Sequence, residues 1–254
     1  MSELSGLYAL WYREIKVFAS EKSRIVSSMI QPLMWLVIFG TGLGSSISLG
    51  SFGGGYGYTS FIYPGILAMT VLFGSIFFGL YIIMDKRVDF LKEVMVAPIS
   101  RTTIFLGKVL GGATDSLIEV LILLVLGSLF FSIHFTPYSL VVTVVFVTLL
   151  TASMVSIGLV IGAMMSSPEG FGLIAGFLIF PLFFLSGALF PVSNLPSWLY
   201  VFVRLNPVSY AFDGMRGAIL GISTFGMIQD FAAIAGFAVA MLIIGTVVFR
   251  RMKI

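Results

Sequence analysis

The sequence predicts an all-α membrane protein with six transmembrane helices, and three observations carry that prediction. Hydrophobic residues make up 59% of the chain and charged residues only 10%, and the mean hydropathy of +1.11 is far above that of a water-soluble domain. Six apolar runs follow one another, each long enough to cross a bilayer. Nearly all basic residues fall on one side of that arrangement. We therefore expect residues 1–254 to form a single transmembrane domain.

Residues 1–24 are expected to form an interfacial helix rather than a span. One apolar stripe recurs at helical spacing, and Arg13 and Glu14 lie mostly off it. Aromatic side chains near the stripe are suited to the headgroup layer of a membrane. The stripe comprises Leu4, Leu7, Trp11, Ile15 and Phe18, and the headgroup-seeking residues are Tyr8, Trp11 and Tyr12.

The six spans are expected at residues 25–43, 59–84, 104–131, 139–165, 170–190 and 231–249. Pro32 lies early in the first span, where its missing amide should bend the helix. An uncharged glycine-rich loop at 44–58 follows this span. Pairs of small residues four apart favour close helix approach, within one chain or between two. These pairs are Gly40/Gly44, Gly107/Gly111, Gly158/Gly162 and Gly172/Gly176.

A charged segment at 85–98 is expected to form a short amphipathic helix of about 12 residues on the membrane surface. Pro98 marks its end, and Ser100 is suited to cap the helix that follows. The charged face is either a docking surface or a solvated linker that joins two spans. The polar arc comprises Asp85, Lys86, Asp89, Lys92 and Glu93, and the apolar arc comprises Val88, Phe90, Leu91, Val94 and Met95.

Residues 191–229 are too apolar for a free loop and too rich in Pro and Gly for one span. We expect a re-entrant hairpin of two short helices there, because irregular backbone at membrane depth survives only inside protein or beside a water-filled cavity. Asp213 and Arg216 are three residues apart and are predicted to pair across one helical turn. This pair is either a gate element or a plain capping pair.

The distribution of Lys and Arg orients the chain. Only Arg204 and Arg216 fall on the side of the predicted hairpin. The positive-inside rule therefore places both termini and segment 85–98 in the cytosol, and the hairpin outside. The cytosolic set comprises Arg13, Lys16, Lys22, Arg24, Lys86, Arg87, Lys92, Arg101, Lys108, Arg250, Arg251 and Lys253.

Several kinds of chemistry are excluded or disfavoured. The one Gly-Lys pair, Gly107-Lys108, has Thr102 and Val109 where a P-loop requires Gly and Ser or Thr. The chain is therefore not expected to hydrolyse ATP by itself. The chain has no cysteine and one histidine, His134, in a turn, so we expect no metal site and no catalytic residue of these types.

Two carboxylates lie within the third span. Asp115 and Glu119 are four residues apart and share one helix face, with Lys108 seven residues before Asp115. Ionisable residues at membrane depth usually face a bundle interior or a water-filled path. The two acids are therefore either the polar lining of a transport route or partner contact, or acids neutralised near a wet cytosolic mouth.

Three segments resemble the type 2 ABC export permeases. They are DFLKEVMVAPISRTTIFLGKVLGG at 89–112, FIYPG at 61–65, and NPVSYAFDGMR at 206–216. Their order and sidedness match the topology above, and the resemblance covers nearly the whole chain. It is closest to the compact drug-resistance and lipochitooligosaccharide permeases, because no large extracellular insert is present.

The resemblance implies a permease subunit that moves an amphipathic compound, drug-like, lipid or lipid-linked, across the cytoplasmic membrane of a prokaryote. Two separate ATP-binding cassette subunits would carry ATP and Mg, and a second permease copy would complete the assembly. No cofactor is expected in this chain and no nucleic acid partner. The implied ATPase-docking residues, on the coupling helix at 85–98 and just after it, are Asp85, Asp89, Lys92, Glu93 and Arg101, and the implied outer-gate residues are Asn206, Pro207, Asp213 and Arg216.

Three alternatives remain open at this stage. One is an exporter of a polysaccharide or lipid-linked glycan, which an aromatic-lined channel would favour. Another is an intramembrane enzyme that uses Asp115 and Glu119 without an ATPase. The last is an ion-coupled secondary carrier, in which the charged segment 85–98 has no evident purpose.

Overall fold

A computed structural model describes residues 3–43, 57–131, 133–192 and 195–252, and every element in these ranges is helical. The predicted glycine-rich loop falls mainly on residues 44–56, which lie outside the described residues, as does Lys253. The elements are α1 (Glu3–Ser20), α2 (Lys22–Val37), a π-helical turn η1 (Ile38–Leu43), α3 (Tyr58–Phe77), α4 (Leu80–Arg87), α5 (Phe90–Val96), α6 (Arg101–Phe130), α7 (Pro137–Met164), α8 (Pro168–Phe184), α9 (Ser197–Leu205), α10 (Pro207–Leu220) and α11 (Met227–Arg251).

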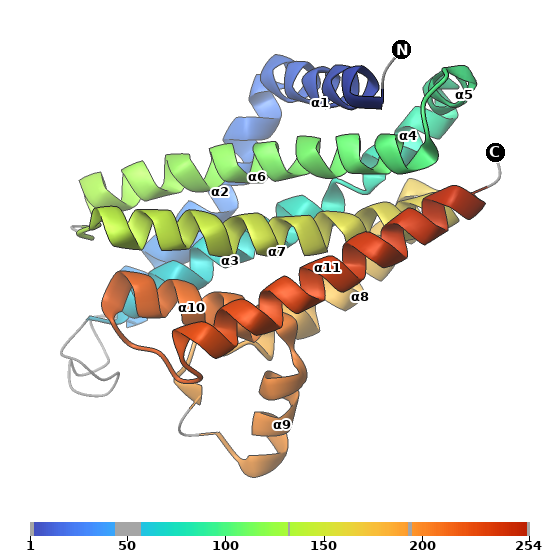
Figure 1. The fold of residues 1–254 in the computed structure, drawn as a ribbon. Coiled ribbons are helices and arrows are strands. Elements are labelled where there is room, and N and C mark those ends of the chain that lie inside the picture. Colours follow the sequence, from blue (N-terminus) through green and yellow to red (C-terminus); the bar gives the residue numbers. More distant parts are fainter. Residues whose placement is uncertain (1–2, 44–56, 132, 193–194, 253–254) are drawn as a thin grey trace.

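The bundle is built around α3 and α7. Helices α6, α7 and α11 run side by side along it, with α3 behind them (Figure 1). α3 is apolar on all sides, and a helix of that kind is stable only when it is buried. Ile62, Leu67, Val71 and Leu72 on α3 are accordingly 0% exposed. The core therefore lies along α3, enclosed by the other long helices.

In the described part of the chain, four segments are long and apolar enough to cross a membrane: Tyr58–Arg87, Arg101–Phe130, Pro137–Met164 and Met227–Arg251. The other two predicted spans are shorter. α8 has 17 residues, and α1 together with 25–40 forms a pair bent by 71°. α2 continues through Pro32 and passes into η1. The membrane character is clear, whereas the six-span arrangement stays a prediction.

The predicted second span is two helices, because the helix is interrupted at Phe78 and Gly79 between α3 and α4. At this interruption the backbone lies directly against the backbone of α7. A Cβ atom on Gly79 would lie 2.0 Å from the carbonyl oxygen of Gly158, and one on Gly158 would lie 2.3 Å from that of Ile76. The predicted role of the Gly158/Gly162 pair in close approach is therefore confirmed within one chain.

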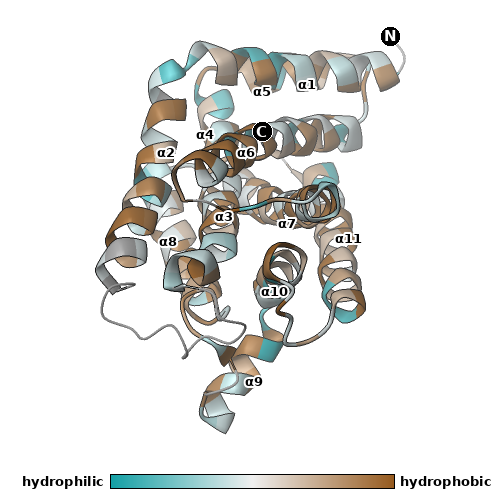
Figure 2. Ribbon diagram, turned by 90° about the vertical axis from the view of Figure 1, so that its left-hand side faces the viewer, coloured by the Kyte–Doolittle hydropathy of each residue, from teal (hydrophilic) through white to brown (hydrophobic). Residues whose placement is uncertain are grey.

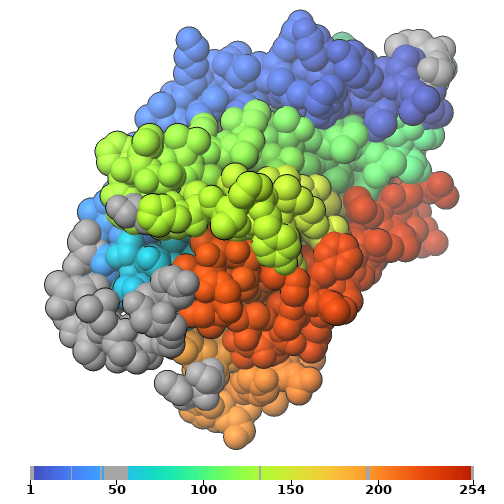
Figure 3. All heavy atoms as spheres, turned by 60° about the vertical axis from the view of Figure 1, so that its left-hand side comes forward, coloured from blue at the N-terminus to red at the C-terminus, as the bar shows by residue number. Residues whose placement is uncertain are grey.

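α1 lies as an outer layer over α6 (Figure 3). The predicted stripe is partly wrong, because the buried face is rotated toward the polar side. Leu4 is 76% exposed, whereas Glu14, expected off the stripe, is 2% exposed. Leu10 and Glu14 fit against Gly107 and Gly111 of α6. The buried face comprises Gly6, Leu10, Glu14 and Phe18.

The surface helix is shorter than the predicted helix at 85–98. α4 continues to Arg87, and Asp89 adopts a left-handed conformation with φ of 58°, so α5 begins only at Phe90. A left-handed non-glycine residue cannot continue an α-helix. Leu91 faces inward at 0% exposure, while Val88, expected on the apolar arc, is 71% exposed.

The segment predicted as a hairpin does contain two short helices, α9 and α10, although residues 193–194 lie outside the described ranges. α9 projects from the bundle, while α10 is buried against α3, α7 and α11 (Figures 1 and 2). The hydropathy colouring shows hydrophilic residues at the α1–α2 junction and at the start of α11 (Figure 2).

Candidate functional site

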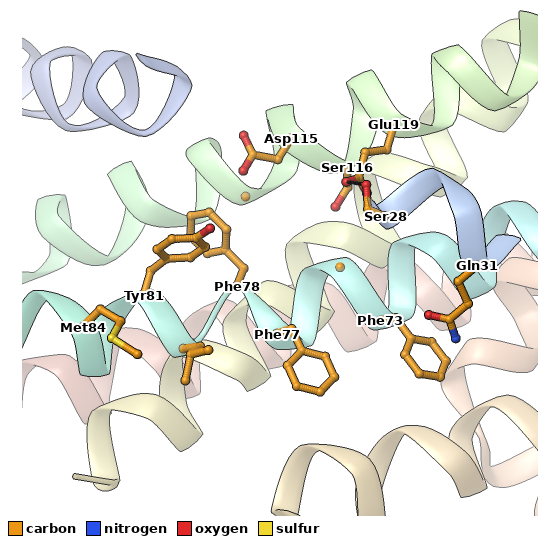
Figure 4. A pocket seen from close by; sticks show the side chains of 13 residues that line it. Ser28, Gln31, Phe73, Phe77, Phe78, Tyr81, Met84, Asp115, Ser116 and Glu119 are labelled. Carbon is orange, nitrogen blue, oxygen red and sulfur yellow. Dashed lines mark hydrogen bonds between the residues drawn. The ribbon is translucent and has the colours of Figure 1, made fainter. Parts of the chain in front are cut away.

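A cavity of about 390 Å³ opens between α2, α3, α4 and α6 (Figure 4). Its lining has two chemical faces. Hydroxyl, amide and carboxylate groups come from α2 and α6, and aromatic rings come from α3 and α4. The polar residues are Ser28, Gln31, Asp115, Ser116 and Glu119, and the aromatic residues are Phe73, Phe77, Phe78 and Tyr81.

Asp115 and Glu119 are both 4% exposed and line this cavity together, as their four-residue spacing predicts. The Ser28 hydroxyl donates a hydrogen bond of 2.6 Å to Glu119 Oε1, which joins α2 to α6. Gly74 lies opposite, and a Cβ there would come within 3.2 Å of Glu119 Oε2. The absence of a side chain at Gly74 therefore keeps the polar face open.

Two further hollows lie along α2. A smaller hollow of about 70 Å³ adds Pro32, Met69 and Thr70 to the lining. A shallow groove of about 510 Å³ lies on the outer side of α2 and includes Met34 and Trp35. Gln31 lines all three spaces. Gln31 therefore lies between an amphipathic interior cavity and an apolar outer groove.

A closed ring of four charges lies where α1, α4 and α6 meet. Lys108 Nζ contacts Glu14 Oε1 at 2.9 Å and Asp85 Oδ2 at 2.5 Å. Arg13 contacts Glu14 Oε1 at 2.7 Å and Asp85 Oδ1 at 2.8 Å. Lys108 is 0% exposed, and both acids are nearly as buried. We call these four residues the charge ring; its two acids and two bases balance.

The charge ring also reaches the surface helix. The Arg13 guanidinium carbon lies 3.8 Å from the centroid of the Phe90 ring, at the first residue of α5. A second contact fixes α1 on α6, since the Trp11 indole N–H donates to the Thr114 hydroxyl at 2.9 Å. Arginine suits such a position because it forms ion pairs and stacks on an aromatic face at the same time.

The structure places the predicted docking residues in three different environments. Asp89 and Lys92 pair at 2.7 Å with side chains 67% and 59% exposed, and Glu93 is also exposed. Asp85, predicted on the exposed arc, is instead buried in the charge ring. Arg101 donates to the carbonyl oxygens of Arg250 and Met252, so it caps the end of α11. Only Asp89, Lys92 and Glu93 form an exposed charged face.

Lys86 has a capping role that the sequence did not reveal. Its Nζ donates to the carbonyl oxygens of Gly162, Ala163 and Met165 at 3.0, 2.6 and 3.2 Å. These carbonyls lie at the end of α7, where the last helical turn leaves acceptors without partners. Lys86 therefore joins α4 to α7 on the side opposite α1.

The predicted pairing of Asp213 with Arg216 is wrong. Asp213 Oδ2 accepts hydrogen bonds from the Ser223 hydroxyl at 3.0 Å and from the amides of Thr224 and Phe225 at 2.6 and 2.8 Å. Arg216 instead donates to the carbonyls of Gly187 and Ala188 and stacks on the Phe61 ring, 4.1 Å from its centroid. Each side chain ties α10 to a different segment, and this replaces a local pair.

Asn206 and Pro207 start α10. The Asn206 side chain accepts a hydrogen bond from the Val208 amide at 3.0 Å, and its amide group donates to the Leu182 carbonyl at 2.7 Å. Pro207 occupies the first helical position, where its missing amide is harmless. The two residues thus cap α10 and join it to α8.

Sequence reasoning missed Glu14, Lys108 and Lys86 as structural centres. The available signals were an acid on α1 and a lysine within the apolar helix α6. A single sequence does not show that these two residues contact each other. Within the described residues, no group of three or more His, Asp or Glu side chains is arranged to hold a metal ion. His134 is exposed in its turn.

Comparison with known proteins gives the family. Residues 5–220 match the family described as ABC-2 type transporter. The chain belongs to this family. The ABC-2 assignment agrees with the resemblance carried by residues 61–65, 89–112 and 206–216.

Three relatives illustrate the range of similarity to this ABC-2 chain. It is 31% identical to the inner membrane transport permease YadH of Escherichia coli K12 over 247 residues, which cover 94% of the chain and 92% of YadH. It is 32% identical to the putative transport permease ycf38 of Cyanophora paradoxa over 196 residues, covering 76% of the chain and 66% of ycf38. It is 26% identical to nodulation protein J of Rhizobium leguminosarum bv. trifolii over 249 residues, covering 96% and 92%.

These comparisons establish a membrane protein of the transport permease kind. Members of this family work with ATPase subunits.

Proposed function

We propose that this chain is the permease subunit of an ATP-driven exporter that moves an amphipathic compound out of the cytoplasmic membrane. Two ATPase subunits would carry ATP and Mg, and a second permease copy would complete the complex. The single observation that carries the proposal is the cavity between α2, α3, α4 and α6. Its polar and aromatic faces fit a compound with a polar head and an apolar body. The apolar groove on the outer side of α2, which shares Gln31 with the cavity, fits entry from the membrane.

The exposed face of α5 is the proposed ATPase-docking surface. Asp89, Lys92 and Glu93 are exposed, while Leu91 on the same helix is anchored at 0% exposure. An exposed charged face on a short, internally anchored helix suits a rim of polar contacts with a soluble partner. Both ends of α5 also carry exposed apolar residues, Val88 at 71% and Val96 at 87%.

The outer face of α8 is the proposed contact for a second copy. Gly172 and Gly176 have open space around the position of a Cβ, and Phe177 beside them is 84% exposed. A small-residue groove on an apolar helix permits close approach of another helix. Homodimer formation through this face gives both copies the same contact.

Copurification tests the proposal. The chain is extracted gently from native membranes, the accompanying proteins are identified, and ATP hydrolysis is measured. We expect a P-loop subunit in about equal amount, lost when Asp89→Lys and Glu93→Lys are combined. Arg204→Glu is the matched control, because Arg204 is an exposed charge on α9 at the other end of the molecule. A pure chain that transports without any ATPase subunit contradicts the proposal.

The aromatic face of the cavity also supports an alternative, export of a polysaccharide or lipid-linked glycan, since aromatic rings suit stacking against sugar faces. An intramembrane enzyme is separated from both by Asp115→Asn combined with Glu119→Gln. An enzyme loses all activity in this variant. An exporter keeps ATP hydrolysis and changes only transport rate or substrate preference.

A further inference from the structure

We propose that the charge ring makes α1, α4 and the first half of α6 one rigid unit, which Arg13 joins to α5 and through which movement of the docking helix reaches the cavity wall. Arg13, Glu14, Asp85 and Lys108 are then positioning residues of the transport cycle. This inference rests on the proposed function, because it assumes that a partner moves α5.

The ring is closed, and this distinguishes it from isolated ion pairs. Each acid contacts both bases: Glu14 through Oε1, and Asp85 through its two separate oxygens. A buried ion pair adds little net stability compared with apolar packing, but breaking one partner leaves an uncompensated buried charge. A closed ring therefore penalises separation of any one of its three helices. Such a ring therefore fixes the relative alignment of the three helices and adds little to the stability of the fold.

Arg13 connects this ring to the docking helix. The left-handed Asp89 separates α4 from α5, so the backbone alone does not fix the direction of α5. The stack of Arg13 on Phe90, at 3.8 Å, adds a constraint from α1 to the anchoring of α5 by Leu91. A force on the exposed side of α5 is thus transmitted to Arg13 and, through the shared acids, to Lys108.

Lys108 connects the ring to the cavity. Asp115 lies seven residues further along the same continuous helix, about 10 Å away along its axis. Gly111 leaves room for Glu14, since a Cβ there would lie 2.5 Å from the Glu14 Cβ, and the next residue, Gly112, lines the cavity. Rotation or translation of the ring therefore displaces the polar face of the cavity directly.

A double-substitution experiment separates alignment from stability. Lys108→Met leaves two buried acids facing one arginine, and Glu14→Gln leaves two cations facing one acid, so each single variant should have a lowered Tm. Combining them retains the Arg13–Asp85 pair with balanced charge, so the Tm should return toward that of the wild type. The closed ring, however, is lost in the double variant.

The decisive readout is the distance between α1 and α5. The chain has no cysteine, so Lys16→Cys and Glu93→Cys introduce two unique, exposed labelling sites for spin labels. We expect a narrow distance distribution in the wild-type ring and a broad one in the Lys108→Met, Glu14→Gln variant. The destabilised control is Tyr63→Phe, which removes a buried hydrogen bond to the Leu123 carbonyl away from the ring and should keep the distribution narrow.

The second readout is the stimulation of the ATPase subunit by the permease in the purified complex. We expect the stable double variant to lose this stimulation. A narrow label distribution with normal stimulation in the double variant overturns the inference and leaves the ring a purely structural feature. The label measurement needs no ATPase. A failure to assemble with an ATPase therefore contradicts the proposed function separately, while the rigidity of the unit is still decided.

Discussion

Glycine at three positions allows the offset second span to lie directly on α7. The hypothetical Cβ atoms of Gly79, Gly158 and Gly162 come within 2.0–2.3 Å of carbonyl oxygens. The neighbouring atoms belong to the backbone, which cannot rotate away as a flexible side chain would. The close contact between the backbones therefore requires glycine at each of the three positions.

Gly158→Ala is expected to destabilise the protein by about 1–3 kcal/mol, because its methyl group would overlap the Ile76 carbonyl. Gly236→Ala is the matched control. Gly236 is exposed in α11 with nothing within 4 Å of the Cβ position, so the variant should gain up to about 1 kcal/mol from helix propensity. Unfolding of the purified chain in detergent measures both. Equal stability of the two variants would show that the contact with α7 is looser than described.

Glu3 ties the start of α1 to the first turn of α6. Its carboxylate accepts hydrogen bonds from the Thr103 hydroxyl and, at 3.0 Å, from the Ser100 amide. The Thr103 bond first, and the Ser100 amide second, lower the pKa of Glu3 below its ordinary value of 4.5. The folded state thus binds the proton more weakly than the unfolded chain does.

The contribution of Glu3 should therefore be present at neutral pH and lost as the pH falls below 4.5 and through the lowered pKa. Glu3→Gln should reduce Tm slightly at neutral pH, since the carboxylate is exposed to solvent. The difference from the wild type should vanish in acid. Thermal unfolding of both proteins over a pH series tests this, and a difference that grows toward low pH would contradict it.

At the residue scale, helical spacing correctly predicted that Asp115 and Glu119 share a face, but it wrongly predicted a pair between Asp213 and Arg216. Asp115 and Glu119 share a face and a cavity because helical periodicity alone determines that relation. Asp213 and Arg216 have suitable spacing too, yet each finds stronger partners from distant segments: the turn at 223–225 for the acid, and the carbonyls of Gly187 and Ala188 for the base. Local spacing shows which pairs are possible, and tertiary packing decides which form.

The Asp213 carboxylate accepts three hydrogen bonds from the turn between α10 and α11. Asp213→Asn replaces a charged acceptor of three hydrogen bonds with a neutral amide. We expect a loss of about 1.5–3 kcal/mol, the range for hydrogen bonds to charged groups. Ser223→Ala removes one donor to Asp213 and the acceptor of the Gly226 amide, and should cost about 1–2 kcal/mol. Unfolding and amide exchange at residues 223–226 measure both, and no change in exchange for Asp213→Asn would refute this account.

At the scale of elements, the sequence located the long helices well but not their interruptions. α6 and α7 begin within three residues of the predicted starts, at Arg101 and Pro137. The left-handed Asp89 and the offset at Gly79 were not predicted. Both depend on contacts with α1 and α7 that lie far away in the sequence, so no local periodicity records them.

The orientation of the whole molecule follows from charges at its two ends and remains to be tested. Lys92→Cys on α5 and Ser197→Cys on α9 are exposed, and the natural chain contains no cysteine. A membrane-impermeant maleimide should label Ser197→Cys in intact cells and Lys92→Cys only after permeabilisation. Labelling of Lys92→Cys from outside would invert the topology and remove α5 from the cytosol.

The number of spans is less determined by sequence than the membrane class is. Hydropathy identifies four long segments directly, whereas α8 and the α1–α2 pair depend on tilt and on neighbouring helices. The buried ring was also out of reach, because Glu14 and Lys108 lie 94 residues apart. Composition therefore predicts that this protein lies in a membrane, but it does not predict which distant residues contact one another.

The separation of the ring residues along the chain has a consequence for synthesis. Arg13 and Glu14 leave the ribosome long before Lys108, and a carboxylate is buried at acceptable cost only when its partners are present. The N-terminal helix must therefore stay in contact with water or headgroups until the third predicted span has been made. Its docking onto that span is a late step, which closes the ring only in chains that have inserted the intervening helices correctly.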